Sequence, residues 1–182
     1  MKRAKKIVLL AHCLLNVNAK VEGIATVAGG CQKLVTELLA AGYGIIQLPC
    51  VEQHCCGIRR WGQVKEQLAF PSFRQRCREL LQPILEQVQD FAQHGYEIAG
   101  VIGLNGSPSC AVNTTCSGNW YGEIGDGYGL PEKIATLRPL QEPGVMMEEL
   151  AAMLEQAGLK VKFLAVNEAD PDSEAQHILS QL

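Results

Sequence analysis

The sequence is poor in aromatic residues and lacks a long apolar run. Aromatic residues make up only 5% of its 182 positions, whereas hydrophobic residues make up 47%, so we expect an aliphatic core. No stretch approaches the roughly 18 consecutive apolar residues that a membrane span needs. His12 interrupts the apolar run near the start, which argues against a signal peptide. These absences predict a globular cytoplasmic protein without a membrane segment.

The chain also lacks an excess of basic residues, internal repeats and linker-like segments. It has 16 Lys and Arg against 19 Asp and Glu, a net charge of −3. That balance argues against a protein whose main role is to bind nucleic acid through its phosphates. Because domains usually hold about 100–200 residues, we predict one domain over residues 1–182.

Short apolar runs alternate with amphipathic helical patterns along the chain. We expect buried strands at 6–11, 44–49, 97–104 and 160–166, and helices at 26–41, 72–95, 143–157 and from Asp170-Pro171 onward. This alternation predicts a doubly wound α/β fold, with a mostly parallel sheet of about four strands and helices on both faces. Residues 111–142 show no usable period, which predicts a long loop or lid.

The sequence contains no Cys-x-x-Cys pair, which disfavours zinc ribbons and thioredoxin-type redox sites. Instead, Cys13, Cys50 and Cys110 each follow a different predicted strand. Ligands of open parallel sheets bind beyond the carboxyl ends of the strands. Three thiolates at such a crevice suit Zn²⁺ or an iron–sulfur cluster. The alternative is that these small side chains only fill strand–loop turns.

The other five cysteines divide into two groups. Cys31 and Cys77 lie on the apolar faces of their predicted helices, where a free cysteine behaves as a small hydrophobic residue. Cys55 and Cys56 are adjacent in a predicted loop, so at most one of them faces a metal held by Cys50. Cys116 falls in the long loop and is a candidate fourth ligand or redox thiol.

Two basic or aromatic groups are weaker candidates. Arg59-Arg60-Trp61, with Lys65, has the character of a phosphate or nucleotide site, or of a solvated loop edge. Trp120-Tyr121 in the long loop could stack on a base or anchor that loop.

Three segments resemble the thiouracil desulfurase family, formerly the domain of unknown function 523. Residues 11–16 (Ala-His-Cys-Leu-Leu-Asn), with 20–23 downstream, resemble its opening motif. Residues 49–52 (Pro-Cys-Val-Glu) resemble its Cys-Pro-Glu segment, and residues 107–110 match its Ser-Pro-Ser-Cys segment. The resemblance covers residues 5–116. Lys20 and Glu22 stand where the family has Arg and Asp, so the chain resembles a divergent branch.

The resemblance implies an iron–sulfur-dependent desulfidase that acts on a small thiolated compound such as a thiolated nucleobase. It implies a [4Fe–4S] cluster held by Cys13, Cys50 and Cys110, with one iron free of protein ligands. In this family the thio sulfur binds that iron, water replaces it on carbon, and sulfide leaves on the cluster. An open coordination position permits such Lewis-acid chemistry.

We interpret Glu52 as the carboxylate that takes a proton from water. It lies two residues after Cys50, so in an extended segment both side chains would point to the same side. Ser107 is a second catalytic candidate, and Ser109, Lys20 and Glu22 are candidates for substrate binding. The alternative roles are a helix N-terminal or surface carboxylate for Glu52 and ordinary turn capping for the serines beside Pro108.

Two other functions fit the same residues. One is a non-catalytic iron–sulfur or zinc protein that senses or delivers sulfur. The other is a thiol–disulfide redox enzyme that uses Cys110–Cys116 or Cys50–Cys55 as a reversible disulfide.

Overall fold

A four-stranded sheet forms the centre of the protein in a computed structural model, which describes residues 2–123, 125, 127, 129–167 and 174–182. The strands run in the order β2-β1-β3-β6, and every neighbouring pair is parallel. Their bounds are β1 (Lys6–Leu10), β2 (Tyr43–Gln47), β3 (Glu97–Asn105) and β6 (Phe163–Asn167). The predicted parallel sheet is therefore confirmed.

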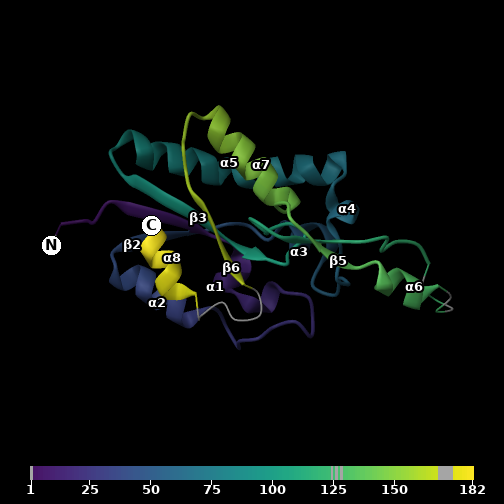
Figure 1. Ribbon diagram of the computed structural model, residues 1–182. Helices are drawn as coiled ribbons and strands as arrows, with labels where there is room; N and C mark the ends of the chain where they lie inside the picture. The colour runs from purple at the N-terminus through teal and green to yellow at the C-terminus, as the bar shows by residue number, and fades with distance from the viewer. Residues whose placement is uncertain (1, 124, 126, 128, 168–173) are drawn as a thin grey trace.

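Helices cover both faces of this sheet (Figure 1). On one face α5 (Pro71–Gln93) packs on α7 (Val145–Gln156), and on the other α2 (Gln32–Ala40) packs on α8 (Ala175–Gln181). The strand β1 lies between β2 and β3, and helices cover both of its faces. Val8, Leu9 and Leu10 are therefore fully buried. This arrangement confirms the doubly wound α/β fold.

Several short helices follow the strand ends. They are α1 (His12–Leu15) and the 3-10 helix η1 (Val17–Ala19) after β1, and α3 (Val51–Cys56) and α4 (Lys65–Leu68) after β2. Helices of three to six residues are too short to show a hydrophobic period, so the sequence did not reveal them. They form the rim at the carboxyl edge of the sheet.

The helix expected over 26–41 begins only at Gln32. The reason is that the backbone before Gln32 forms hydrogen bonds with the short helices of the rim instead of bonds within a helix of its own. The amide of Val17 donates to the carbonyl of Gly29 over 2.8 Å, and the amide of Cys31 donates to the carbonyl of Leu14 over 2.8 Å.

Residues 111–142 are not the irregular loop that the sequence predicts. They contain the antiparallel pair β4 (Thr115–Ser117) and β5 (Arg138–Leu140), with α6 (Leu130–Ala135) at the projecting end (Figure 1). Strands of three residues are too short to show alternation, so this ribbon was missed. Its base is tied to α4, because the Ser117 hydroxyl donates to the Glu66 carboxylate.

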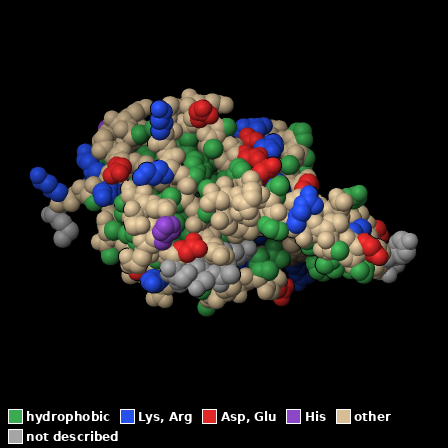
Figure 2. Space-filling view, viewed as in Figure 1, with side chains coloured by type: hydrophobic (Ala, Val, Ile, Leu, Met, Phe, Trp, Pro, Cys, Tyr) green, Lys and Arg blue, Asp and Glu red, His purple; other side chains and the backbone are tan. Residues whose placement is uncertain are grey.

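A network of ion pairs joins α4, α5 and α7, and acidic and basic side chains gather in this region in Figure 2. The buried Lys65 ammonium lies 2.7 Å from Glu142 and 2.6 Å from Glu148. Arg74 binds both Glu148 and Glu149. Lys65 and the two α7 carboxylates thus help to fix the rim to the helical layer.

The core is aliphatic, as expected, and it includes Cys31 and Cys77, which are 2% and 0% exposed. Their predicted place in the core is confirmed. None of the described helices has both the length and the apolar character needed to cross a bilayer. The expected helix start at Asp170-Pro171 lies outside the described residues.

Candidate active site

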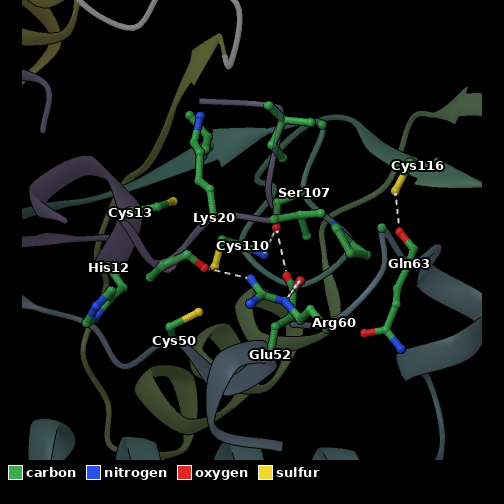
Figure 3. Close-up of a pocket in the computed structure, with 17 residues that line it drawn as sticks. His12, Cys13, Lys20, Cys50, Glu52, Arg60, Gln63, Ser107, Cys110 and Cys116 are labelled. Carbon is green, nitrogen blue, oxygen red and sulfur yellow. Dashed lines mark hydrogen bonds and ion pairs between the residues drawn. The ribbon is translucent and has the colours of Figure 1, made fainter. Parts of the chain in front are cut away.

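A pocket of about 200 Å³ opens beyond the carboxyl ends of β1 and β3. In the strand order these two central strands are neighbours, with β2 beyond one and β6 beyond the other. This is the place where open α/β sheets bind their ligands. The residues labelled in Figure 3 line it: His12, Cys13, Lys20, Cys50, Glu52, Arg60, Gln63, Ser107, Cys110 and Cys116.

Cys13, Cys50 and Cys110 reach this pocket from three strand ends. Cys13 lies in α1, directly after β1. Cys50 is the N-cap residue of α3, and its sulfur accepts the Gln53 amide over 3.5 Å. Cys110 ends the turn that follows β3 and is 4% exposed. Residues distant in sequence are brought together, as parallel strands predict.

The surroundings of Cys50 and Cys110 disfavour the ionised forms of these two thiols. Burial raises the pKa of Cys50. Burial also raises the pKa of Cys110 well above its usual range, and the neighbouring charges of Cys13, Glu52 and Cys50 act in the same direction. The three sulfurs and the carboxylate are thus close enough to influence one another. A metal group bound here would have to displace the thiol protons.

Cys13, Cys50 and Cys110 line one pocket without forming a site for a single metal ion. Within the part of the chain that the structure describes, no three Cys, His, Asp or Glu side chains are grouped to bind a single metal ion. A cubane cluster differs from a single ion, because each ligand sulfur binds a different iron atom. The three thiols that line this pocket supply three such sulfurs.

Glu52 does not lie in an extended segment, contrary to the sequence prediction. The chain turns after β2 and starts α3 at Val51, so Glu52 is in the first turn of this helix. It nevertheless faces the pocket and is 7% exposed. Its carboxylate accepts hydrogen bonds from Ser107 over 3.3 Å, from Ser109, and from the Arg60 Nε over 3.4 Å.

The two serines organise the turn that carries Cys110. The Ser107 Oγ accepts the amides of Ser109, over 3.3 Å, and of Cys110, over 3.0 Å. Ser109 is 1% exposed and lies behind the pocket wall, where its Oγ is 3.4 Å from the Cys110 sulfur. Ser107 therefore caps the turn, as the alternative interpretation expected, and Ser109 contacts a predicted ligand sulfur.

Close backbone packing holds this turn in place. A Cβ atom at Gly103 would lie 2.4 Å from the Cys110 carbonyl oxygen, and one at Gly144 would lie 2.4 Å from the Ser109 carbonyl carbon. The first amides of α7 donate to the same turn, with Met146 bonding the Ser109 carbonyl over 3.0 Å. These amides have no partner within their own helix, so the turn satisfies them.

Lys20 and Glu22 differ in their access to the pocket. Lys20 lines the pocket, as predicted for a residue that binds substrate. Glu22 is exposed and lines a neighbouring hollow, to which Lys20 also contributes. The structure therefore brings Lys20, but not Glu22, to the three cysteines.

The chain is similar to an archaeal protein. The uncharacterized protein MJ0003 of Methanocaldococcus jannaschii is 36% identical over 110 residues, which span 60% of this chain and 70% of that protein. The chain belongs to the same family as this archaeal protein. No family model matches the chain, and no solved structure is significantly similar to it. The relative is uncharacterized, so this membership assigns no activity.

The pairing of Arg60 with Glu52 was not recognised in the sequence. Arg60 is not at a solvated loop edge, because its side chain is 5% exposed and pairs with Glu52. The sequence carries no local signal for this contact, because it depends on how the chain folds after α3. Trp120 anchors the ribbon beside the pocket, as one of the two sequence interpretations expected, since its indole donates to the Gly62 carbonyl over 3.0 Å.

The remaining cysteines differ in their access to the pocket. Cys116 lines it, and its thiol donates to the Gln63 carbonyl over 3.2 Å. Cys55 and Cys56 are exposed and line another hollow together with His54. The eight cysteines, all of them described, are unbridged.

Proposed function

We propose that this protein is an iron–sulfur-dependent desulfidase of the reducing cytoplasm, which removes sulfur from a small thiolated compound such as a thiolated nucleobase. The observation that carries the proposal is the meeting of Cys13, Cys50 and Cys110 with the buried Glu52 carboxylate in one pocket. Three soft ligands supply a site for a [4Fe–4S] cluster, and a carboxylate beside them supplies a base.

The three cysteines would hold the cluster and leave one iron without a protein ligand. When bound, such a cluster supplies a Lewis acid that polarises a C–S bond and accepts the departing sulfide. The net reaction replaces C=S by C=O, with water consumed and hydrogen sulfide released, so no oxidant or reductant is needed.

Glu52 would take the proton from the attacking water. Its Oε1 accepts from both serines, whereas among the described residues its Oε2 contacts only Arg60, over 3.4 Å. Oε2 therefore has capacity for a water molecule in the pocket. Ser107 and Ser109 fix the direction in which the carboxylate points.

The proposal is tested by anaerobic reconstitution with iron and sulfide, followed by assay of sulfide released from 2-thiouracil and 4-thiouracil. We expect several turnovers per cluster and uracil as the product. Cys110→Ser should lose both iron and turnover, whereas Cys31→Ser, which changes a cysteine of the core, should keep both. A protein that holds its cluster but releases no sulfide would instead support a sulfur carrier or sensor.

A thiol–disulfide redox enzyme is a second candidate, because Cys116 lines the same pocket as Cys110. Cys116→Ser separates the two functions. A desulfidase would keep its turnover in this variant, whereas a redox enzyme would lose thiol–disulfide exchange.

A further inference from the structure

Arg60 lies almost fully buried in the wall of the pocket and has more donors than protein acceptors. A guanidinium carries five N–H groups. Its Nε contacts Glu52 over 3.4 Å, its Nη1 donates to the Gly57 carbonyl over 3.2 Å, and its Nη2 donates to the Ala19 carbonyl over 2.7 Å. Each terminal nitrogen carries two hydrogens, so two N–H groups lack an acceptor among the described residues.

These two donors need an acceptor from the contents of the pocket. A buried charged donor without a partner is costly, so such groups are normally satisfied by water or ligand. The side chain is 5% exposed and lines the pocket. In Figure 3 the guanidinium lies between Glu52 and the sulfurs of Cys50 and Cys110. A ligand that directs its sulfur to the cysteines would therefore bring its neighbouring atoms to Arg60.

We propose that Arg60 determines substrate specificity by donating a hydrogen bond to an oxo oxygen of the substrate. This oxygen is on the ring carbon that the thioamide nitrogen joins to the carbon of the C–S bond. This inference rests on the proposed desulfidase function and assigns recognition of the ring carbonyl group to one residue of the site. A planar guanidinium suits an acceptor in the plane of such a ring. The contacts to Gly57 and Ala19 hold the guanidinium still, so little conformational freedom is lost on binding.

The experiment compares two thiolated rings that differ in one group. 2-Thiouracil carries an oxo oxygen next to its thioamide, and pyrimidine-2-thione does not. With the cluster-loaded protein we expect kcat/KM for 2-thiouracil to exceed that for pyrimidine-2-thione by about 10- to 100-fold, the effect of one hydrogen bond from a charged donor. In Arg60→Met this ratio should fall to about 1, and Arg60→Lys should retain part of it.

A binding measurement on the same loaded proteins gives a readout independent of turnover. Uracil has the second oxo group and pyrimidin-2-one lacks it, so their competition with a bound thiolated ring reports the same contact. We expect Arg60→Met to remove the preference for uracil. Arg59→Met is the matched control, because Arg59 is exposed and lines a separate hollow. Arg59→Met should keep both the kcat/KM ratio of the two thiolated rings and the binding preference for uracil over pyrimidin-2-one. The unfolding temperatures of all variants report whether the fold is intact.

The outcomes separate this inference from the proposed function. If Arg60→Met slows both substrates equally and leaves both ratios unchanged, Arg60 only positions Glu52 and the inference is overturned. If the loaded native protein turns over neither ring, the desulfidase function fails. The binding ratio for uracil then still decides whether Arg60 recognises the oxo group.

Discussion

Ser107 donates a hydrogen bond to Glu52 over 3.3 Å, although 55 positions separate the two residues in the chain. The Ser107 oxygen already accepts two backbone amides, so its proton is directed to the carboxylate. This contact joins the turn after β3 to the helix after β2. The residue that fixes the position of Cys110 therefore also fixes the position of the proposed base.

Glu52→Gln should slow sulfide release by about 10²–10⁴-fold, because the amide keeps the size of the side chain but cannot accept a proton from water. The iron content should not change, since no ligand is altered. Sulfide release per cluster from 2-thiouracil is the measurement, with Glu155→Gln on the exposed end of α7 as the control. Unchanged turnover in Glu52→Gln would remove this residue from the mechanism.

Gly103→Ala should displace the turn that carries Cys110, because the new Cβ would meet the Cys110 carbonyl oxygen at 2.4 Å. We expect a loss of about 1–3 kcal/mol in the free energy of unfolding, as for other overpacked sites, and weaker retention of iron. Urea denaturation and iron analysis measure the two effects. Gly29→Ala is the matched control, since a Cβ there meets no atom within 4 Å. Equal behaviour of both variants would show that the turn adapts freely.

Substitution should separate the cysteines into structural residues and ligands. Cys77→Ser should lower the unfolding temperature modestly and leave the iron content unchanged, because Cys77 is fully buried among apolar residues. Cys13→Ser and Cys50→Ser should lose most of the iron. Loss of iron from Cys77→Ser would mean that the roles of the cysteines are wrongly assigned.

The ionisation of Glu149 should make the free energy of unfolding depend on pH in the acid range. Burial opposes its ionisation, but hydrogen bonds from Arg74 and Arg78 lower the pKa of this carboxyl below its ordinary 4.5. The contribution of ionised Glu149 to the free energy of unfolding is therefore present above about pH 4.5. It is lost as the pH falls through the lower pKa of the folded state. Arg78 is half exposed, so we expect Arg78→Met to cost at most roughly 1 kcal/mol at pH 7 and less at pH 3. Equal losses at both pH values in urea denaturation would contradict this.

The sheet and the meeting of the three cysteines were predictable, whereas the polar partners in the site were not. Parallel strands place their carboxyl ends at one edge, so residues that directly follow β1, β2 and β3, as Cys13, Cys50 and Cys110 do, come near one another. The partners of Glu52 depend instead on the helical start of α3 and on the turn at Ser107. Such contacts arise from tertiary packing of segments too short to carry a period.

The β4–β5 ribbon illustrates the same limit. Each strand has three residues, and its attachment depends on single contacts such as that between Ser117 and Glu66. Arg60 is a further case, because its charge suggested a solvated site. Its burial depends on acceptors supplied by Glu52, Gly57 and Ala19 together.

The central claim is that Cys13, Cys50 and Cys110 hold an iron–sulfur cluster, and the most direct test is iron and sulfide analysis of protein purified without air. We predict a brown protein that absorbs near about 400 nm and holds iron and acid-labile sulfide in equal amounts, about four of each per chain. A colourless protein with iron well below one atom per chain after anaerobic reconstitution would contradict the account.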